Sequence, residues 1–166
     1  GDASGNEFMI TEGTAVVTGD LVIGKDEGST DNTASISGTN ALLQVVSDLY
    51  AGRDGSENTL NIANGGVVEV LSAYVGFTTN SRFNTISVSG TNSAFSINDT
   101  LYAGYDGSGN TVEVLDGASL TTFDAYLGYA SSDNQIEVSG SNSVFSVLND
   151  LFIGNSETNI NNALGI

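Results

Sequence analysis

The sequence predicts an all-β fold, a single-stranded parallel β-helix (solenoid) of about six coils, each 24–28 residues long with three short strands. Two repeating signals predict it. A short group such as LYAG (49–52) closes each unit, and an asparagine opens each unit ahead of an alternating apolar run. The asparagines are Asn6, Asn32, Asn58, Asn84, Asn110 and Asn134. Self-similarity at this period indicates one structural unit per repeat, stacked on its neighbours.

The first strand of each unit directly follows the asparagine. Leu60 and Ile62 stand two residues apart, and a period of two is the signature of a strand with one buried face. The same parity turns Asn58 inward. We therefore expect the six asparagines to form an internal ladder in which each amide bonds the next, because buried polar groups need partners. The alternative is a surface asparagine in a left-handed turn conformation.

The second and third strands come from two further short runs in each unit. Alternating segments such as 68–70 and 95–97 follow a turn rich in Gly, Asn or Ser, and the LYAG-like group supplies the last strand. The chain contains no proline, and the windows lack the 3.6-residue period of a helix. Three short strands per unit of about 25 residues, separated by such turns, are typical of a β-helix coil.

The length of the chain suits one domain, and we assign residues 1–166 to a single β-helix. Neither end carries the polar cap that a solenoid needs for solubility. We therefore expect the chain to be an excised segment of a longer solenoid, or to have its ends covered by neighbouring coils or by end-to-end self-association.

Composition narrows the function. The net charge of -17, from 20 acidic and three basic residues, repels phosphate, so neither nucleic-acid binding nor binding to anionic membranes is expected. Membrane insertion is not expected either. The absence of Cys and His removes disulfides, thiolate metal sites and the commonest general base. Few cations balance the acidic surface, which favours a saline, extracellular setting. No apolar stretch reaches the roughly 18 residues of a membrane-spanning helix.

Two segments resemble a known class of proteins. The segments are GSGNTVEVLDGASL (107–120) before AYLG and GSENTLNIANGGVVEV (55–70) before AYVG. They resemble the repeat regions of bacterial autotransporter passengers and haemagglutinin-like exoproteins, and the resemblance extends from about residue 5 to 160. It implies a right-handed parallel β-helix, secretion, a cell-surface location, and adhesion or shielding. Coils longer than the hexapeptide type also favour the right-handed form.

The outward position of the third strand is aromatic in most coils, and the residue after the glycine adds a second aromatic column. Adjacent coils lie about 4.8 Å apart, so these rings are expected to form an exposed stripe. Such a stripe is a candidate contact surface for a cell-surface glycan or a protein partner. The alternative is that the rings only stabilise the sheet as ladders of like residues. The stripe consists of Tyr50, Tyr74, Phe77, Tyr102, Tyr105, Tyr126 and Tyr129.

Acidic residues in the turns raise the question of a metal. Segments 54–58 (DGSEN) and 106–110 (DGSGN) superficially resemble a calcium loop, but they lack the remaining ligand spacing and the bidentate acid. Asp and Asn at such turns normally serve the backbone geometry. We expect no cofactor and no dedicated metal site, with weak calcium binding as the alternative.

The sequence offers little support for an enzymatic role. Glu113 and Glu137 are expected to be neighbours one coil apart, near the about 5 Å carboxylate spacing of a retaining glycosidase. Any two acids stacked in a β-helix have that spacing, so it carries almost no information. Our main hypothesis is a non-catalytic structural and adhesive module that forms a stiff, acidic rod. The alternative is a carbohydrate-processing module of tailspike or lyase type.

Overall fold

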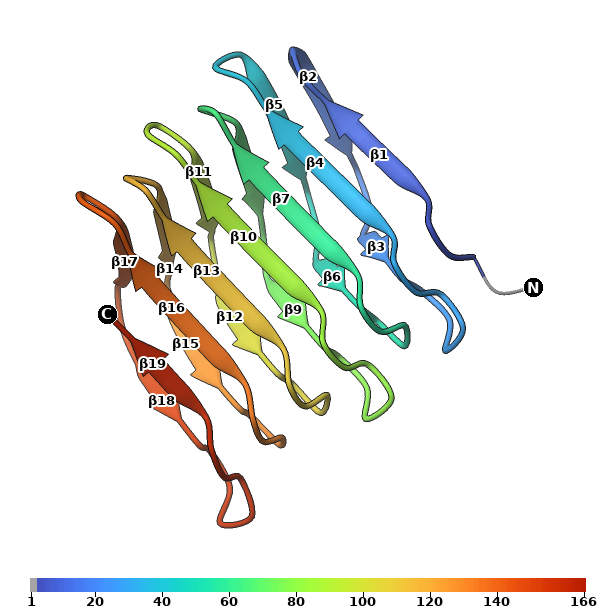
Figure 1. Ribbon diagram of the computed structural model, residues 1–166, viewed down its shortest axis with the longest axis vertical. Helices are drawn as coiled ribbons and strands as arrows, with labels where there is room; N and C mark the ends of the chain where they lie inside the picture. Colours follow the sequence, from blue (N-terminus) through green and yellow to red (C-terminus); the bar gives the residue numbers. More distant parts are fainter. Residues whose placement is uncertain (1–2) are drawn as a thin grey trace.

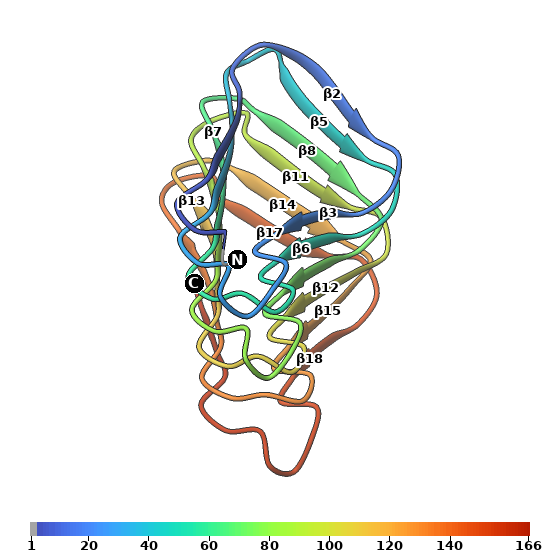
Figure 2. The same ribbon diagram turned by 90° about the vertical axis from the view of Figure 1, so that its right-hand side faces the viewer.

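A computed structural model describes residues 3–166, which form three parallel sheets wound into a β-solenoid of about six turns and contain no helix (Figure 1). Seen from the N-terminal end, the chain runs clockwise as it recedes, so the coil is right-handed (Figure 2). The predicted parallel β-helix with three strands per coil is therefore confirmed.

Each coil contributes one strand to each sheet. Sheet A contains β1 (Glu7–Ile10), β4 (Thr33–Ser37), β7 (Thr59–Ala63), β10 (Thr85–Ser89), β13 (Thr111–Leu115), β16 (Gln135–Ser139) and β19 (Ala163–Gly165). Sheet B contains β2 (Gly13–Val17), β5 (Ala41–Val45), β8 (Val67–Val70), β11 (Ala94–Ile97), β14 (Ser119–Thr122) and β17 (Val144–Val147). Sheet C contains β3 (Leu21–Ile23), β6 (Leu49–Ala51), β9 (Ala73–Val75), β12 (Thr100–Ala103), β15 (Asp124–Leu127) and β18 (Leu151–Ile153).

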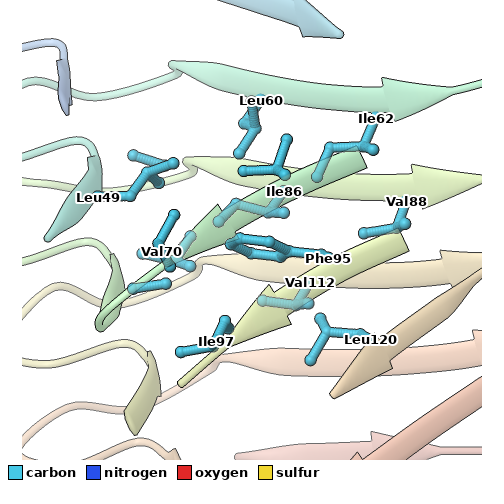
Figure 3. Packing of buried hydrophobic residues seen from close by; sticks show 14 of the residues in the cluster. Leu49, Leu60, Ile62, Val70, Ile86, Val88, Phe95, Ile97, Val112 and Leu120 are labelled. Carbon is cyan, nitrogen blue, oxygen red and sulfur yellow. The ribbon is translucent and has the colours of Figure 1, made fainter. Parts of the chain in front are cut away.

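The core lies inside the coil, where alternate residues of all three sheets meet. The labelled side chains of Figure 3, among them Leu60, Ile86 and Phe95, point into this space and are at most 3% exposed. Size alternates along the stack in sheet C, since Ala73 is paired between Leu49 and Leu101. Large over small fills the layers without voids. Each fully buried aliphatic side chain contributes roughly 1.5–3 kcal/mol by leaving water.

The asparagine that recurs in each coil forms a continuous amide ladder at the corner where sheet C turns into sheet A. After Asn6, each Oδ1 of the ladder accepts two hydrogen bonds from the asparagine one coil earlier. For Asn84, the donors are the backbone nitrogen and Nδ2 of Asn58, at 2.9 and 3.1 Å. The ladder links Asn6, Asn32, Asn58, Asn84, Asn110, Asn134 and Asn162. Asn162 extends it beyond the six asparagines of the prediction.

The ladder asparagines point inward, as the parity of the strands predicted. Asn58, Asn84 and Asn110 are fully buried, and every buried side-chain nitrogen or oxygen in residues 3–166 has a hydrogen-bond partner. The left-handed backbone conformation falls instead on the residue before each ladder asparagine, as at Glu57 (φ 59°) and Asp133 (φ 60°). The alternative of a surface turn asparagine is therefore wrong.

The glycine that closes the LYAG-like group is tied to the ladder. Gly52 has a φ of +75°, and a Cβ placed on it would lie 2.2 Å from Nδ2 of Asn84. Gly24, Gly76, Gly104 and Gly128 stand in the same relation to later ladder asparagines. The two repeating sequence signals therefore belong to one structural device, in which the backbone of one coil leaves room for an amide of the next.

Replacing Asn84 with Ala tests the ladder. The change leaves the buried backbone nitrogen of Asn58 without its acceptor, while Nδ2 of Asn58 keeps its bonds to the carbonyl oxygens of Ser29 and Ser56. We expect a loss of about 2 kcal/mol in the free energy of unfolding, since an orphaned buried polar group costs about 1–3 kcal/mol. Denaturant unfolding measures it. Asn61→Ala, on the outer face of the same sheet, is the control and should change stability little; equal losses in the two variants would contradict a structural ladder.

Phe83 precedes Asn84 and shares the left-handed backbone conformation, with a φ of 57°. A bulky side chain rarely adopts this conformation. The ring is 62% exposed, so its burial does little to offset the strain. The equivalent positions in the other coils are Gly5, Asp31, Glu57, Gly109, Asp133 and Asn161.

Phe83→Asn should therefore stabilise the protein by about 1 kcal/mol, because Asn adopts the left-handed conformation more readily than other side chains. The measurement is the midpoint of thermal unfolding. Phe83→Leu keeps both the strain and an apolar side chain and should give no gain. A less stable Asn variant would show that contacts of the Phe83 ring outweigh its backbone strain.

Candidate functional site

The outer face of sheet C carries a column of stacked rings. Strand pairing sets Tyr74 beside both Tyr50 and Tyr102, and Tyr126 beside both Tyr102 and Phe152. Neighbouring rings in this column have centroids 4.7–5.2 Å apart and are tilted by only 6–11°. The column is thus a direct product of the in-register stacking of coils.

A second column follows the glycine after each of these strands. The ring of Tyr105 stacks on Phe77 at 5.1 Å and on Tyr129 at 4.9 Å. Rings of the two columns meet edge to face, with centroids 5.2–5.8 Å apart. We call these eight rings the aromatic array: Tyr50, Tyr74, Phe77, Tyr102, Tyr105, Tyr126, Tyr129 and Phe152.

The structure corrects the expectation that these rings are exposed. Tyr50 is only 9% exposed, and the other rings of the predicted stripe are half-buried. The cause is the coil spacing, since rings about 4.8 Å apart cover one another's faces. The guanidinium of Arg53 covers Tyr50 as well, 5.3 Å from the ring centroid. The edges and hydroxyl groups are the parts of the rings left for a partner.

Burial changes the ionisation of three tyrosines of the array. It raises the pKa of Tyr50, Tyr74 and Tyr102 above the ordinary value for a phenol. The hydroxyl of Tyr50 donates a hydrogen bond of 3.5 Å to Asp48, whose own pKa is raised by burial and by the nearby charge of Asp20. The hydroxyls of these three tyrosines therefore stay protonated and can donate and accept hydrogen bonds over the whole physiological pH range.

Exposed apolar side chains recur at the corner between sheets B and C, with the polar Asn98 at the equivalent position in the coil between Leu71 and Phe123. Val46, Leu71, Phe123 and Leu148 lie there and are between 45% and 66% exposed. We call these four residues the corner ridge. The sequence pattern does not predict these residues, because they stand just after the second alternating run, where no strand periodicity assigns a face. The sequence does contain one indication of them: in each case an apolar residue directly follows the last inward residue of the run.

The turn acids do not converge. Asp54 accepts a hydrogen bond from Thr78, and Asp133 accepts one of 3.0 Å from Asn161. Asp31 and Glu57 hold the left-handed positions described above. Across residues 3–166, no three acidic side chains gather as metal ligands would. These acids therefore serve the turns, as Asp at such positions often does.

Glu113 and Glu137 are neighbours, as expected, and pair in register on the outer face of sheet A. Both are partly exposed on a regular sheet surface. Two cavities are found at the open ends of the solenoid, away from this pair. One, of about 390 Å³, lies beside Asn6 and Leu21, and the other, of about 480 Å³, beside Phe145 and Leu164.

Comparisons with known proteins add no assignment: no family model, no curated protein and no solved structure matches the chain significantly. Residues 3–166 also include no helix of the length and hydropathy needed to cross a bilayer.

The raised pKa values predict an alkaline limit to stability. Below the tyrosine pKa of the unfolded state, about 10, both the folded and the unfolded protein keep the phenol protons. The buried tyrosines then make their full contribution to the free energy of unfolding. As the pH rises further, the unfolded state loses its protons first, so stability falls until the folded pKa is passed. Denaturant unfolding from about pH 9 to pH 11 should show this fall, and Tyr74→Phe/Tyr102→Phe should flatten it. An unchanged slope in that variant would place the titrating groups elsewhere.

Proposed function

We propose that this chain is a non-catalytic structural and adhesive module of a secreted or cell-surface bacterial protein, a stiff acidic rod that contacts a glycan or protein partner. The observation that carries the proposal is the uninterrupted repetition of the molecule. The ladder links seven asparagines along the whole stack, and the ring column of sheet C joins five successive strands.

Continuous ladders favour a rigid body. Each coil is fixed to the next by three parallel strand pairings, by the amide bonds and by ring stacking. A solenoid of this kind gains stability from neighbour contacts and keeps a constant surface along its length. Such a surface suits an extended partner or a spacer role. The net charge of -17 supports a setting in which salt screens the surface.

The contact surface proposed is the aromatic array together with the corner ridge. Ring faces inside the columns are covered, so sugar stacking on them is not available. The hydroxyl edges offer hydrogen bonds instead, while Leu71, Phe123 and the other ridge residues offer apolar contact area beside them. Polar edges next to exposed apolar side chains are the combination found at protein and glycan contact sites.

The alternative, a carbohydrate-processing module, has less support. Acid–base work by two carboxylates depends on environments that separate their pKa values. Glu113 and Glu137 share a regular, partly exposed surface. Release of reducing ends or unsaturated products from polysaccharides by the purified chain would favour this alternative over the adhesive module.

Arrays of glycans and of extracellular host proteins, probed with the purified chain, test the proposal. Tyr102→Phe/Tyr126→Phe removes two hydroxyl edges without unstacking the rings, and Leu71→Ser/Phe123→Ser removes half of the ridge. We expect wild type to bind at least one ligand and one of these variants to bind it about tenfold more weakly, which corresponds to about 1.4 kcal/mol.

Glu113→Gln/Glu137→Gln on sheet A serves as the control and should bind as wild type does. If all three variants lose binding equally, the interaction is a general effect of charge or folding. If wild type binds nothing, the chain is a spacer rather than an adhesive module.

A further inference from the structure

The aromatic array concentrates the oxidisable side chains of the protein. All six tyrosines of the chain belong to it, and the sequence has no Trp, no Cys and no His. Met9, the single methionine, lies in β1 of sheet A. Since Trp, Cys, Tyr and Met are the side chains that lose electrons most readily, an oxidising equivalent that reaches this protein is drawn mainly to the array.

Stacking also brings equivalent atoms of adjacent tyrosines together. Nearly parallel rings on paired residues are expected to present the same edge in the same direction, which would set the carbon ortho to one hydroxyl next to its counterpart one coil away. Four pairs are arranged in this way, with centroids 4.9–5.2 Å apart and tilts of 6–10°: Tyr50–Tyr74, Tyr74–Tyr102, Tyr102–Tyr126 and Tyr105–Tyr129. Edge-to-face neighbours such as Tyr102 and Tyr105 do not align these carbons.

We propose that the array is a modification site at which one-electron oxidation couples stacked tyrosines of adjacent coils into dityrosine. The oxidant is of the peroxidase class, with hydrogen peroxide as the terminal electron acceptor. Two phenols each lose one electron and the hydroxyl proton. The two phenoxyl radicals form one carbon–carbon bond between ortho carbons, and the hydrogens on those carbons shift to the oxygens. The protein loses two hydrogen atoms in total, and the peroxide is reduced to two waters.

The surroundings of the array can accept the hydroxyl protons that the tyrosines lose on oxidation. Asp48 accepts a hydrogen bond from the hydroxyl of Tyr50 and takes its proton on oxidation. The remaining tyrosines are half-buried with free edges and release theirs to water. Ring contacts below 6 Å let a radical formed on one tyrosine migrate to the next.

The product is a covalent link between coils. Joining two stacked tyrosines closes a loop of one coil, and loop closure stabilises the fold by restricting the unfolded chain. A chain without cysteine cannot form the disulfides that strengthen many extracellular proteins. Dityrosine provides this strengthening by a different chemistry.

Two triple variants with equal tyrosine content test the proposal. Tyr74→Phe/Tyr102→Phe/Tyr126→Phe keeps Tyr50 and the stacked pair Tyr105–Tyr129. Tyr74→Phe/Tyr126→Phe/Tyr129→Phe keeps three tyrosines, none stacked on another within its column. Phe preserves the ring contacts in both. Each protein is treated at low concentration with peroxidase and hydrogen peroxide, and dityrosine is followed by its fluorescence and located by mass spectrometry of Asp- and Glu-specific digests.

Wild type should form dityrosine within single chains, with the loss of two hydrogens mapped to peptides from adjacent coils. The variant that keeps Tyr105–Tyr129 should retain the fluorescence, and the variant without a stacked pair should lose it. Equal yields in the two variants, cross-links found only between separate chains, or tyrosine loss without dityrosine in wild type would each overturn the proposal.

Discussion

The structure depends on a buried side-chain amide that bonds to its own copies in the neighbouring coils. In the ladder the oxygen of Asn84 accepts from Asn58 of the preceding coil, and its Nδ2 donates to Asn110 of the following coil. Here the Oδ1 of one asparagine accepts from the backbone and the side chain of another, so the bond pattern continues only if every coil repeats the residue in the same register. The repeat in the sequence is a consequence of this requirement.

Other regularities follow from the same corner. The amide occupies the space where a Cβ would otherwise lie, so the preceding coil carries glycine there, as Gly76 does before Asn110. The residue before the amide must turn through a left-handed conformation, which most coils meet with Gly, Asp or Asn. Because the ladder fixes the register of adjacent coils at this corner, it also fixes the register of the strand pairs in all three sheets. The ring columns of sheet C exist because Tyr50, Tyr74 and Tyr102 have no freedom to slip past one another.

The sequence was sufficient to predict the structure wherever the alternation of inward and outward residues along a strand decides where a side chain lies. Alternation assigned Leu60 and Asn58 to the inside, and the fold followed from stacking such units. It was insufficient for the outer surface. Parity places Tyr74 outside the core but does not say that rings one coil apart hide each other's faces. Phe123 stands at a corner, where parity has no meaning. Asn162 was missed because a longer turn delays it to 28 residues after Asn134, although Leu164 and Ile166 continue the alternation behind it.

The alternation of large and small residues inside sheet C constrains how such a protein can change its length. Ala73 fits because Leu49 and Leu101 flank it, and Leu101 fits because Ala73 and Ala125 do. Deleting the coil that carries Leu101 would set Ala73 on Ala125 and leave a void in the middle of the rod. Deleting or duplicating two consecutive coils keeps large residues over small ones at this position. We therefore expect a solenoid of this kind to gain or lose coils in pairs during evolution, although each structural repeat is a single coil.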